Sequence, residues 1–359
     1  MTLQDLEHQL KNIIWVQGDK KEIDLSLGEE FLVTTLMKIA DTSWGRDTLD
    51  YETIGKWLDN FTGELYDCRY ERILALILAV HMVYYNECHI CHLVKLAYRK
   101  LLHEIMGKEH IGTEAAAESL VFLPLGEVSE SGPFLSYYFR KENCLPVESF
   151  VASFDLIAQR KKVKNIVLMD DVSISGEQAD WYIKKMRKTS EFFREVLNEK
   201  NVYALFLMST IDAKEKLEEY NIKLCTPILM DRRSCCFDEE SSIYKIFDNS
   251  IRDEVRIQSK NLAQYYGCKL IIRQYKRNGE FQRLLNSGKS LEDIIQKVKK
   301  DSLGYGNAQM LIAFEYNTPN STLPIIWIED GKWKSLFRRY DKLYTKQIVE
   351  GIESESVYI

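Results

Sequence analysis

The chain has 359 residues, of which 45% are hydrophobic and 28% are charged. This composition is ordinary for a soluble globular protein, and a chain of this length can bury a core large enough to fold without disulfides. The formal net charge of −6 gives no reason to expect a surface that coats nucleic acid, although a local basic patch is compatible with it.

The sequence shows no targeting or membrane segment. Its first residues lack the basic stretch followed by an apolar stretch that a secretory signal needs. The most apolar run, residues 73–83, is about half the length that spans a bilayer, so it predicts a buried helix. The eight cysteines are scattered, and we therefore expect free thiols in a cytoplasmic protein that does not bind membranes.

Apolar residues at helical spacing fill the first third of the chain. This pattern predicts helices over residues 3–14, 29–40 and 51–61. Residues 71–106 carry apolar side chains at nearly every third or fourth position and contain neither Pro nor Gly. They predict one or two packed helices that end at Gly107, a natural C-cap.

Short apolar runs replace this pattern after residue 110. They are typical of buried strands and lie at residues 119–125, 165–169, 202–208 and 223–230. Helical stretches at residues 177–197 and 212–220 separate the last three runs. Strand–helix alternation at this spacing predicts βαβ units in a parallel sheet, with right-handed crossovers and ligand sites at the carboxyl ends of the strands.

The pattern changes again near residue 237. Residues 241–266 predict a long helix stopped at Gly267, and residues 290–299 predict a second helix with Ser290 and Asp293 as a capping box. Strands are expected at residues 309–316 and 323–328, on either side of a turn. The expected division is a helical N-terminal domain (1–112), an α/β core (113–236) and a C-terminal part (237–359).

The segment most informative about function follows the second apolar run. Asp170 and Asp171 come directly after it, and Gly176 follows at the start of the next expected helix. Residues 172–178 can point successive backbone N–H groups into a concavity at the helix N-terminus, which suits a phosphate. Gly176 removes a side chain that would block the approach of that anion.

Side chains in the same segment suit the rest of a sugar phosphate. Ser173, Ser175 and Gln178 add hydrogen-bond donors to the loop. The carboxylates of Asp170 and Asp171 can accept hydrogen bonds from vicinal hydroxyls, directly or through a bound Mg²⁺. A phosphate and a diol held close together describe a ribose 5-phosphate.

This segment resembles the ribose-phosphate-binding motif of type I phosphoribosyltransferases, which has four apolar residues, two acidic residues and a small-residue loop with Gly. The corresponding parts here are residues 166–169, Asp170 with Asp171, and residues 172–176. The resemblance implies an α/β fold with a Rossmann-like parallel sheet of the phosphoribosyltransferase type. It also implies a 5-phosphoribosyl donor such as PRPP and a Mg²⁺ cofactor, with Asp170 and Asp171 as catalytic and metal-binding residues.

The resemblance assigns the phosphate to the loop that follows the acidic pair. Its residues are Ser173, Ile174, Ser175, Gly176, Glu177 and Gln178. The chain departs from the family pattern at Ile174, where Thr is usual, and at Gln178, where Thr or Ser is usual. These departures put the usual hydroxyl contacts in doubt.

Two further segments are candidate binding sites. The resemblance places a pyrophosphate loop after the first apolar run, with Gly126, Ser129, Ser131 and Gly132 as its residues. A polar Gly/Ser turn between a strand and a helix is the structural alternative. Arg232 and Arg233 follow the last run at the expected ligand edge, where they can neutralise pyrophosphate or an anionic acceptor. A solvated loop is the alternative there.

A second resemblance concerns residues 303–327. They are similar to the tail of phosphoribosyltransferase-like proteins encoded in bacterial conflict systems, including some retron loci. The matching parts are a Gly-rich turn (304–307), an apolar strand (311–315), an Asn-Thr-Pro-Asn turn (317–320) and a Leu-Pro-x-x-Trp strand (323–327). The resemblance implies a C-terminal hood and a role in anti-phage defence, with a reverse transcriptase–nucleic acid complex or another defence-system protein as partner. For the Asn-Thr-Pro-Asn turn, a plain hairpin turn is the alternative.

Other signals in the sequence are weaker. Cys88, Cys91 and His92 share a helix face, but a zinc site needs four ligands and no second pair stands at matching spacing. The acidic pair can also belong to another phosphate or Mg²⁺ site, or have a purely structural role. All six histidines lie at or before residue 110, which argues against histidine acid–base chemistry in the expected sheet.

Three functions remain open on these observations. The leading hypothesis is a phosphoribosyltransferase-like effector of an anti-phage system, an enzyme of the glycosyltransferase class. The first alternative is a toxin that uses the same pocket to cleave the glycosidic bond of a nucleotide. The second is a non-catalytic nucleotide-binding or structural subunit that associates with a reverse transcriptase and its nucleic acid.

Overall fold

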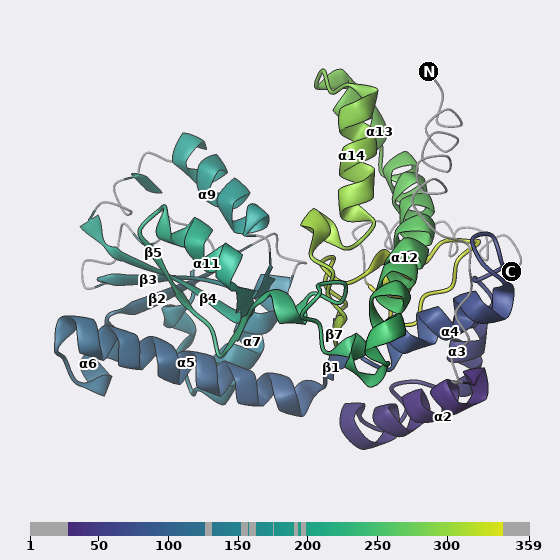
Figure 1. The fold of residues 1–359 in the computed structure, drawn as a ribbon. Coiled ribbons are helices and arrows are strands. Elements are labelled where there is room, and N and C mark those ends of the chain that lie inside the picture. The colour runs from purple at the N-terminus through teal and green to yellow at the C-terminus, as the bar shows by residue number, and fades with distance from the viewer. Residues whose placement is uncertain are drawn as a thin grey trace, which may run out of the picture. The chain divides into compact units, whose positions relative to one another are not determined.

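The computed structural model describes residues 28–125, 131–151, 157, 163–174, 176–189, 193–194 and 199–339. These residues fall into two compact units (Figure 1). One unit is Tyr85–Asp231. The other joins the chain up to Tyr84 with the chain from Arg232 onward, so residues far apart in the sequence share it. In the described part of the chain, no helix is long and apolar enough to cross a membrane.

The Tyr85–Asp231 unit is built on a parallel sheet. Its strands are β2 (Leu120–Pro124), β3 (Asn165–Ser173), β4 (Asn201–Thr210), β5 (Ile222–Cys225) and β6 (Ile228–Met230). The strand order is β2-β3-β4-β5, and β6 also pairs with β4. In-register parallel pairs run from Leu120 beside Asn165 to Pro124 beside Met169, and every strand pair of this sheet is parallel.

Helices cover both faces of this sheet (Figure 1). They are α5 (Glu87–Glu109), α6 (Thr113–Glu118), α7 (Ser131–Glu142), α9 (Glu177–Thr189) and α11 (Ile211–Glu218), with a 3-10 turn at Val147–Ser149. On one face, Leu168 and Phe206 join a core with Ile183 of α9 and Leu217 of α11. On the other face, the Phe122 ring lies 5.1 Å from that of Phe139 on α7. Strands buried on both faces need continuous apolar runs, which is the pattern that predicted them.

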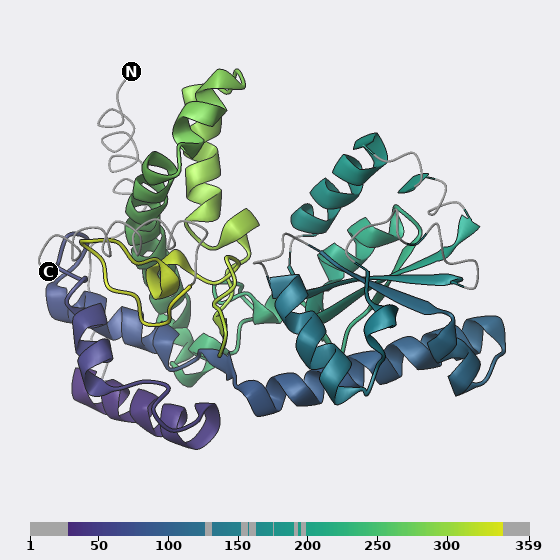
Figure 2. The same ribbon diagram turned by 180° about the vertical axis from the view of Figure 1, so that it is seen from behind.

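The predicted parallel α/β fold is confirmed by this unit. Strands β2, β3 and β4 fall on the predicted apolar runs, although β3 and β4 extend further. The run at residues 223–230 is divided into β5 and β6 around Pro227, which has no N–H to donate to a ladder. Figure 2 shows the sheet from behind, again with helices on both of its faces.

The other unit is mainly helical. Before the sheet unit it contains α2 (Glu29–Ile39), a π-helical turn (Ala40–Trp44), α3 (Tyr51–Leu58), α4 (Cys68–Ala79) and the start of β1 (Val83–Tyr85). After the sheet unit it contains 3-10 turns at Arg232–Ser234 and Ile243–Ile246, then α12 (Asn249–Arg277), α13 (Glu280–Asn286), α14 (Leu291–Asp301), a 3-10 turn at Tyr305–Asn307, β7 (Ile312–Phe314) and α15 (Pro324–Trp327).

One hydrophobic core unites the two sequence segments of this unit. Leu74 of α4 is fully buried in the same cluster as Leu262 of α12 and Ile326 of α15. The indole N–H of Trp57 donates to the Ile325 carbonyl at 2.8 Å, and strand β1 pairs with β7. This grouping differs from the expected division into three ranges, because the N-terminal helices bury their apolar faces against the C-terminal segment.

Several helix boundaries also differ from the sequence expectations. Residues 323–328 contain α15 rather than a strand, with Pro324 at its first position, where a missing N–H costs nothing. Helix α12 continues through Gly267, which was expected to end it. A Cβ there would lie 2.3 Å from the Ser302 carbonyl oxygen, so close packing requires Gly at this position. Residues 71–106 form α4 and α5 with β1 between them, and α5 ends at Glu109.

Other local predictions are confirmed. Helices α2 and α3 begin at the predicted residues, and Ser290 and Asp293 form the predicted capping box of α14. The helix expected at residues 3–14 lies outside the described residues.

Candidate functional site

The carboxyl ends of β2, β3 and β4 lie at one edge of the parallel sheet, and the helices that follow these strands begin there. Helix α9 starts at Glu177, shortly after β3 ends at Ser173, and α11 starts directly after Thr210, the last residue of β4. The first-turn N–H groups of such helices lack partners within the helix and carry a partial positive charge. The edge therefore suits an anion.

Gly132 allows the start of helix α7 to lie close against the same edge. A Cβ on this buried residue would lie 2.3 Å from the Leu125 carbonyl oxygen and 3.2 Å from that of Met169. Leu125 follows β2, and its N–H donates to the Met169 carbonyl at 2.8 Å. The absence of a side chain at residue 132 thus lets the first turn of α7 approach the ends of β2 and β3.

The acidic pair lies inside β3, and both side chains are buried. Because neighbouring side chains on a strand point to opposite faces, Asp170 shares a face with Leu168 and Asp171 shares a face with Met169. Leu168 belongs to the core that includes α9 and α11, whereas the Met169 sulfur lies 3.6 Å from the Ser136 hydroxyl of α7. The sequence predicts both residues after the strand, whereas β3 continues through Ser173 and both side chains are buried.

Each carboxylate is also tied to the backbone beside it. Asp170 accepts from the Asp171 N–H at 2.9 Å, and Asp171 accepts from the Val172 N–H at 2.8 Å. A carboxylate can accept up to about four hydrogen bonds, so these two bonds are compatible with a bound ligand. The pair thus places oxygen acceptors on both faces of β3, immediately before the loop that leads to α9.

That loop is fastened to the neighbouring strand β4. The Ser209 hydroxyl donates to the Ser173 carbonyl at 2.9 Å, and the Thr210 hydroxyl donates to the Ile174 carbonyl. Thr210 also accepts from the Ala213 N–H at 3.1 Å and so caps α11. Two loop carbonyls are therefore directed at β4.

Gly176 closes the loop with a left-handed backbone conformation. Its φ is +66°, and a Cβ there would lie 3.0 Å from Lys216 Cδ and 3.1 Å from Ala213 Cα. Its carbonyl accepts the first helical bond of α9, from the Asp180 N–H at 2.8 Å. Glycine is therefore required both by φ and by the proximity of α11.

The first turn of α9 carries an acidic residue whose charge is compensated. Asp180 accepts from Lys184 at 2.8 Å and from the Tyr220 hydroxyl. Burial opposes ionisation of Asp180, but these hydrogen bonds and the charges of Lys184 and Lys216 lower its pKa overall. The carboxylate is thus paired with cations, which limits its repulsion of an anion at the start of the helix.

Some predicted site residues are not placed. Gly126, Ser129 and Ser175 lie outside the described residues. Ser131, Glu177 and Gln178 occupy the first positions of α7 and α9, but their side chains are not described. Of the predicted pyrophosphate loop, residues 126–132, the structure therefore places only Gly132 and the start of α7.

Arg232 and Arg233 form a 3-10 turn directly after β6 and Asp231, and both are exposed. They are the first residues of the chain's return to the helical unit. Their assignment to pyrophosphate or an acceptor stays a prediction.

Sequence reasoning missed Ser209, Thr210 and Lys216. A signal for the first two was present, because a Ser-Thr pair follows an apolar run in the same way as the acidic pair does. Lys216 is one of several lysines on α11, and its position across Gly176 depends on the packing of two helices. No local pattern identifies it.

The oxygen donors of the site fit a Mg²⁺ that arrives with a phosphorylated ligand. Mg²⁺ commonly takes one or two protein carboxylates and completes its shell with waters and substrate phosphates. Asp170 and Asp171 supply carboxylates of this kind. Within the described residues, no group of three or more His, Cys, Asp or Glu side chains is placed to hold an ion by itself.

The chain matches a known protein family over most of its length. The model of the family PRTase-CE matches residues 54–339. The crystal structure of orotate phosphoribosyltransferase from Aeropyrum pernix is a distant match at 20% identity and a TM-score of 0.24, covering 40% of this chain and 72% of that protein. No curated protein sequence gives a significant match.

Proposed function

Because this chain belongs to the PRTase-CE family, we propose that it binds a 5-phosphoribosyl compound such as PRPP at the carboxyl edge of its sheet and acts as a phosphoribosyltransferase-like enzyme. The observation that carries the proposal is the buried pair Asp170 and Asp171, followed at once by the Gly176 loop and the N-terminus of α9. A diol-binding group beside an anion-binding group matches the two ends of a ribose 5-phosphate.

Each part of the edge has a role in this proposal. The 5-phosphate binds the N–H groups of the loop and of the first turn of α9. Asp170 and Asp171 accept hydrogen bonds from the ribose hydroxyls and orient the sugar. The start of α7, positioned by Gly132, receives the pyrophosphate. A Mg²⁺ bound through a carboxylate of the acidic pair would supply positive charge for the pyrophosphate.

The proposed reaction is a displacement at the anomeric carbon. The bond from this carbon to the pyrophosphate oxygen breaks, and its electron pair leaves with pyrophosphate. An acceptor nucleophile forms the new bond to the same carbon and gives up its proton to solvent or base. The chain contributes by holding the sugar in place and by stabilising charge, a role that needs no histidine in the sheet.

Product analysis tests this function. The protein is incubated with PRPP, Mg²⁺ and a panel of nucleobases, and phosphorus NMR follows the release of pyrophosphate. The expected result is pyrophosphate release that requires an acceptor and is lost in Asp170→Asn with Asp171→Asn. Release of free base from nucleotides, with no dependence on pyrophosphate, would instead assign a nucleotide-cleaving activity to the same pocket.

We further propose that the protein is an effector of a bacterial anti-phage system of the retron type, with a reverse transcriptase and its nucleic acid as partners. The similarity of residues 303–327 to the tails of conflict-system proteins supports this role. Leu311, Leu323 and Trp327 of this segment are buried in the core of the helical unit, so the segment is an integral part of the fold. A phage plating assay with the complete locus should lose protection when Asp170 and Asp171 are both changed to Asn.

A further inference from the structure

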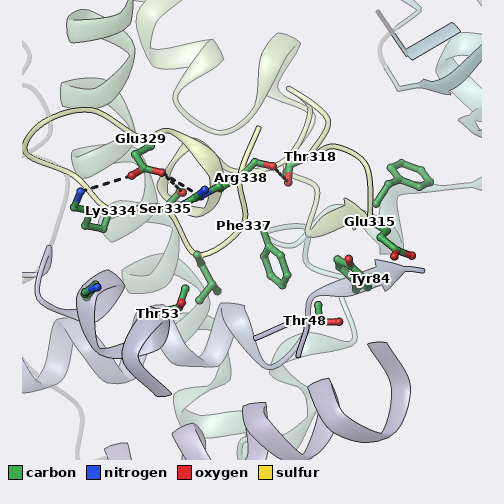
Figure 3. Close-up of a pocket in the computed structure, with 13 residues that line it drawn as sticks. Thr48, Thr53, Tyr84, Glu315, Thr318, Glu329, Lys334, Ser335, Phe337 and Arg338 are labelled. Atoms are coloured by element: carbon green, nitrogen blue, oxygen red, sulfur yellow. Dashed lines mark hydrogen bonds and ion pairs between the residues drawn. The ribbon is translucent and has the colours of Figure 1, made fainter. Parts of the chain in front are cut away.

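The helical unit contains a pocket of about 390 Å³. Its walls come from the α3 region, with Thr48, Thr53 and Lys56, and from the C-terminal segment between Phe314 and Arg338 (Figure 3). All of its lining residues belong to this unit, so the pocket is separate from the carboxyl edge of the sheet. Its volume is within the range of small-molecule sites.

One wall of the pocket is aromatic and apolar. The Phe337 ring stacks on Tyr84 with centroids 5.6 Å apart, and Trp44 meets Phe337 edge-on at 5.4 Å. Burial, together with the negative charge of Glu315, raises the pKa of Tyr84 to about 12, so its hydroxyl stays protonated at neutral pH. Leu336 continues the wall. Such a surface accepts the uncharged, planar part of a ligand.

The opposite rim carries two cations and one carboxylate. The Lys334 ammonium and the Arg338 guanidinium both face Glu329, with N–O distances of 3.7 and 3.9 Å. Both distances are too long for hydrogen bonds to the Glu329 carboxylate. The Ser335 hydroxyl donates to Glu329 instead, at 3.1 Å. Lys334 and Arg338, with side chains 54% and 67% exposed, therefore keep N–H donors for an anion.

Neutral and acidic groups lie between these two walls. Thr48 and Thr53 place hydroxyl groups along the pocket near α3, and Glu315 lies beside Tyr84 (Figure 3). Hydroxyl groups can hydrogen-bond to a sugar, and a carboxylate can accept from the N–H groups of a base. The pocket thus combines groups for an anion, for a polyol and for a planar ring.

We propose that this pocket is a second ligand site, which binds a nucleoside 5′-phosphate with the phosphate at Lys334 and Arg338 and the base along Phe337 and Tyr84. An inorganic phosphate would leave most of the volume empty, and a nucleoside alone would bring no acceptor to the N–H donors of Lys334 and Arg338, whose contacts with Glu329 are too long for hydrogen bonds. The site would let the helical unit sense a nucleotide, or a 5′-phosphorylated end of a nucleic acid, independently of the sheet edge.

Calorimetric titration of the full-length protein tests this site. The ligands are the nucleoside monophosphates, the matching nucleosides, inorganic phosphate and a short oligonucleotide with or without a 5′-phosphate. At least one monophosphate is expected to bind about tenfold or more tightly than its nucleoside. If the phosphorylated oligonucleotide binds more tightly than every monophosphate, the ligand of this pocket is the 5′-phosphorylated end of a nucleic acid.

Matched variants locate the binding event. Lys334→Gln with Arg338→Gln should weaken it about tenfold or more, whereas Arg338→Lys should restore part of the affinity because it keeps the charge. Lys332→Gln changes an exposed lysine outside the pocket lining and should have no effect. The titrations are repeated with Asp170→Asn, which removes a ribose contact of the sheet edge, so that binding at this pocket is measured by itself. The proposal is overturned if no monophosphate binds, if the double variant binds normally, or if Asp170→Asn abolishes all binding.

Discussion

Thr210 joins the proposed phosphate loop to the rest of the sheet. Its hydroxyl donates to the Ile174 carbonyl and accepts from the Ala213 N–H, so it acts on the loop and on the cap of α11. The resemblance to the type I phosphoribosyltransferase motif predicts Thr at the position of Ile174, and here a hydroxyl reaches the loop from the adjacent strand. Thr210 is thus a positioning residue for the site.

Thr210→Val should lower both the stability of the protein and its affinity for the ligand. Loss of the cap should lower the free energy of unfolding by about 1 kcal/mol, measured by urea denaturation. Loss of the loop bond should lower the affinity for ribose 5-phosphate by about three- to tenfold, measured by calorimetry. Thr210→Ser keeps the hydroxyl and should bind nearly as wild type. Equal affinities for Val and Ser at this position would contradict the role of the hydroxyl.

Gly132 and Gly107 give a contrasting pair of helical glycines. A Cβ at Gly132 would meet the Leu125 carbonyl oxygen at 2.3 Å, whereas a Cβ at Gly107 would have no neighbour within 4 Å. Gly132→Ala should therefore displace α7 and destabilise the protein. Gly107→Ala should stabilise it by about 0.5–1 kcal/mol, because alanine loses less backbone entropy in a helix. Similar effects of the two changes on thermal unfolding would argue against the close contact at Gly132.

The cysteines report on the packing of individual strands and helices. Burial raises the pKa of Cys225 in β5 and of Cys268 in α12 to about 12, so neither forms a thiolate at neutral pH. Cys88 on α5 and Cys144 after α7 are exposed. An aromatic disulfide reagent should label these two in the native protein and the buried pair on unfolding. Rapid native labelling of Cys225 would show that β5 is not packed as described.

The sequence predicted those elements that carry a clear pattern within a short stretch of the chain. Strands β2, β3 and β4 are continuous apolar runs, and Ser290 with Asp293 caps α14 through neighbouring residues. Helix α15 was missed because its apolar residues are buried on all sides by distant segments, which removes the helical period.

The sequence also predicted only some residues of the candidate site. The acidic pair and Gly176 were identified from composition and spacing. The opposite directions of the two carboxylates were not, because polar residues at the end of a buried strand resemble a loop in the sequence. Ser209 and Thr210 reach the loop only because β4 pairs with β3. The sequence of a single strand does not show which strand it pairs with.

The chain builds its helical unit from both ends and inserts the sheet unit between them. Leu74 is fully buried in the core shared by α4, α12 and α15. Leu74→Ala should therefore destabilise the helical unit by about 2–5 kcal/mol and increase hydrogen exchange in α12 and α15 as well as in α4. Leu168→Ala, in the other core, should increase exchange in the sheet. Faster exchange confined to α2–α4 in the Leu74 variant would contradict a shared core.

Binding of PRPP with Mg²⁺ by calorimetry tests the central claim most directly. The comparison is between the wild type, Asp170→Asn with Asp171→Asn, and Asp41→Asn, an exposed carboxylate of the helical unit. The wild type and the Asp41 variant should bind equally. The double variant should bind about a hundredfold or more weakly, because each lost charged hydrogen bond contributes about 1.5–3 kcal/mol. Undiminished binding by a folded double variant would contradict a phosphoribosyl site at the carboxyl end of β3.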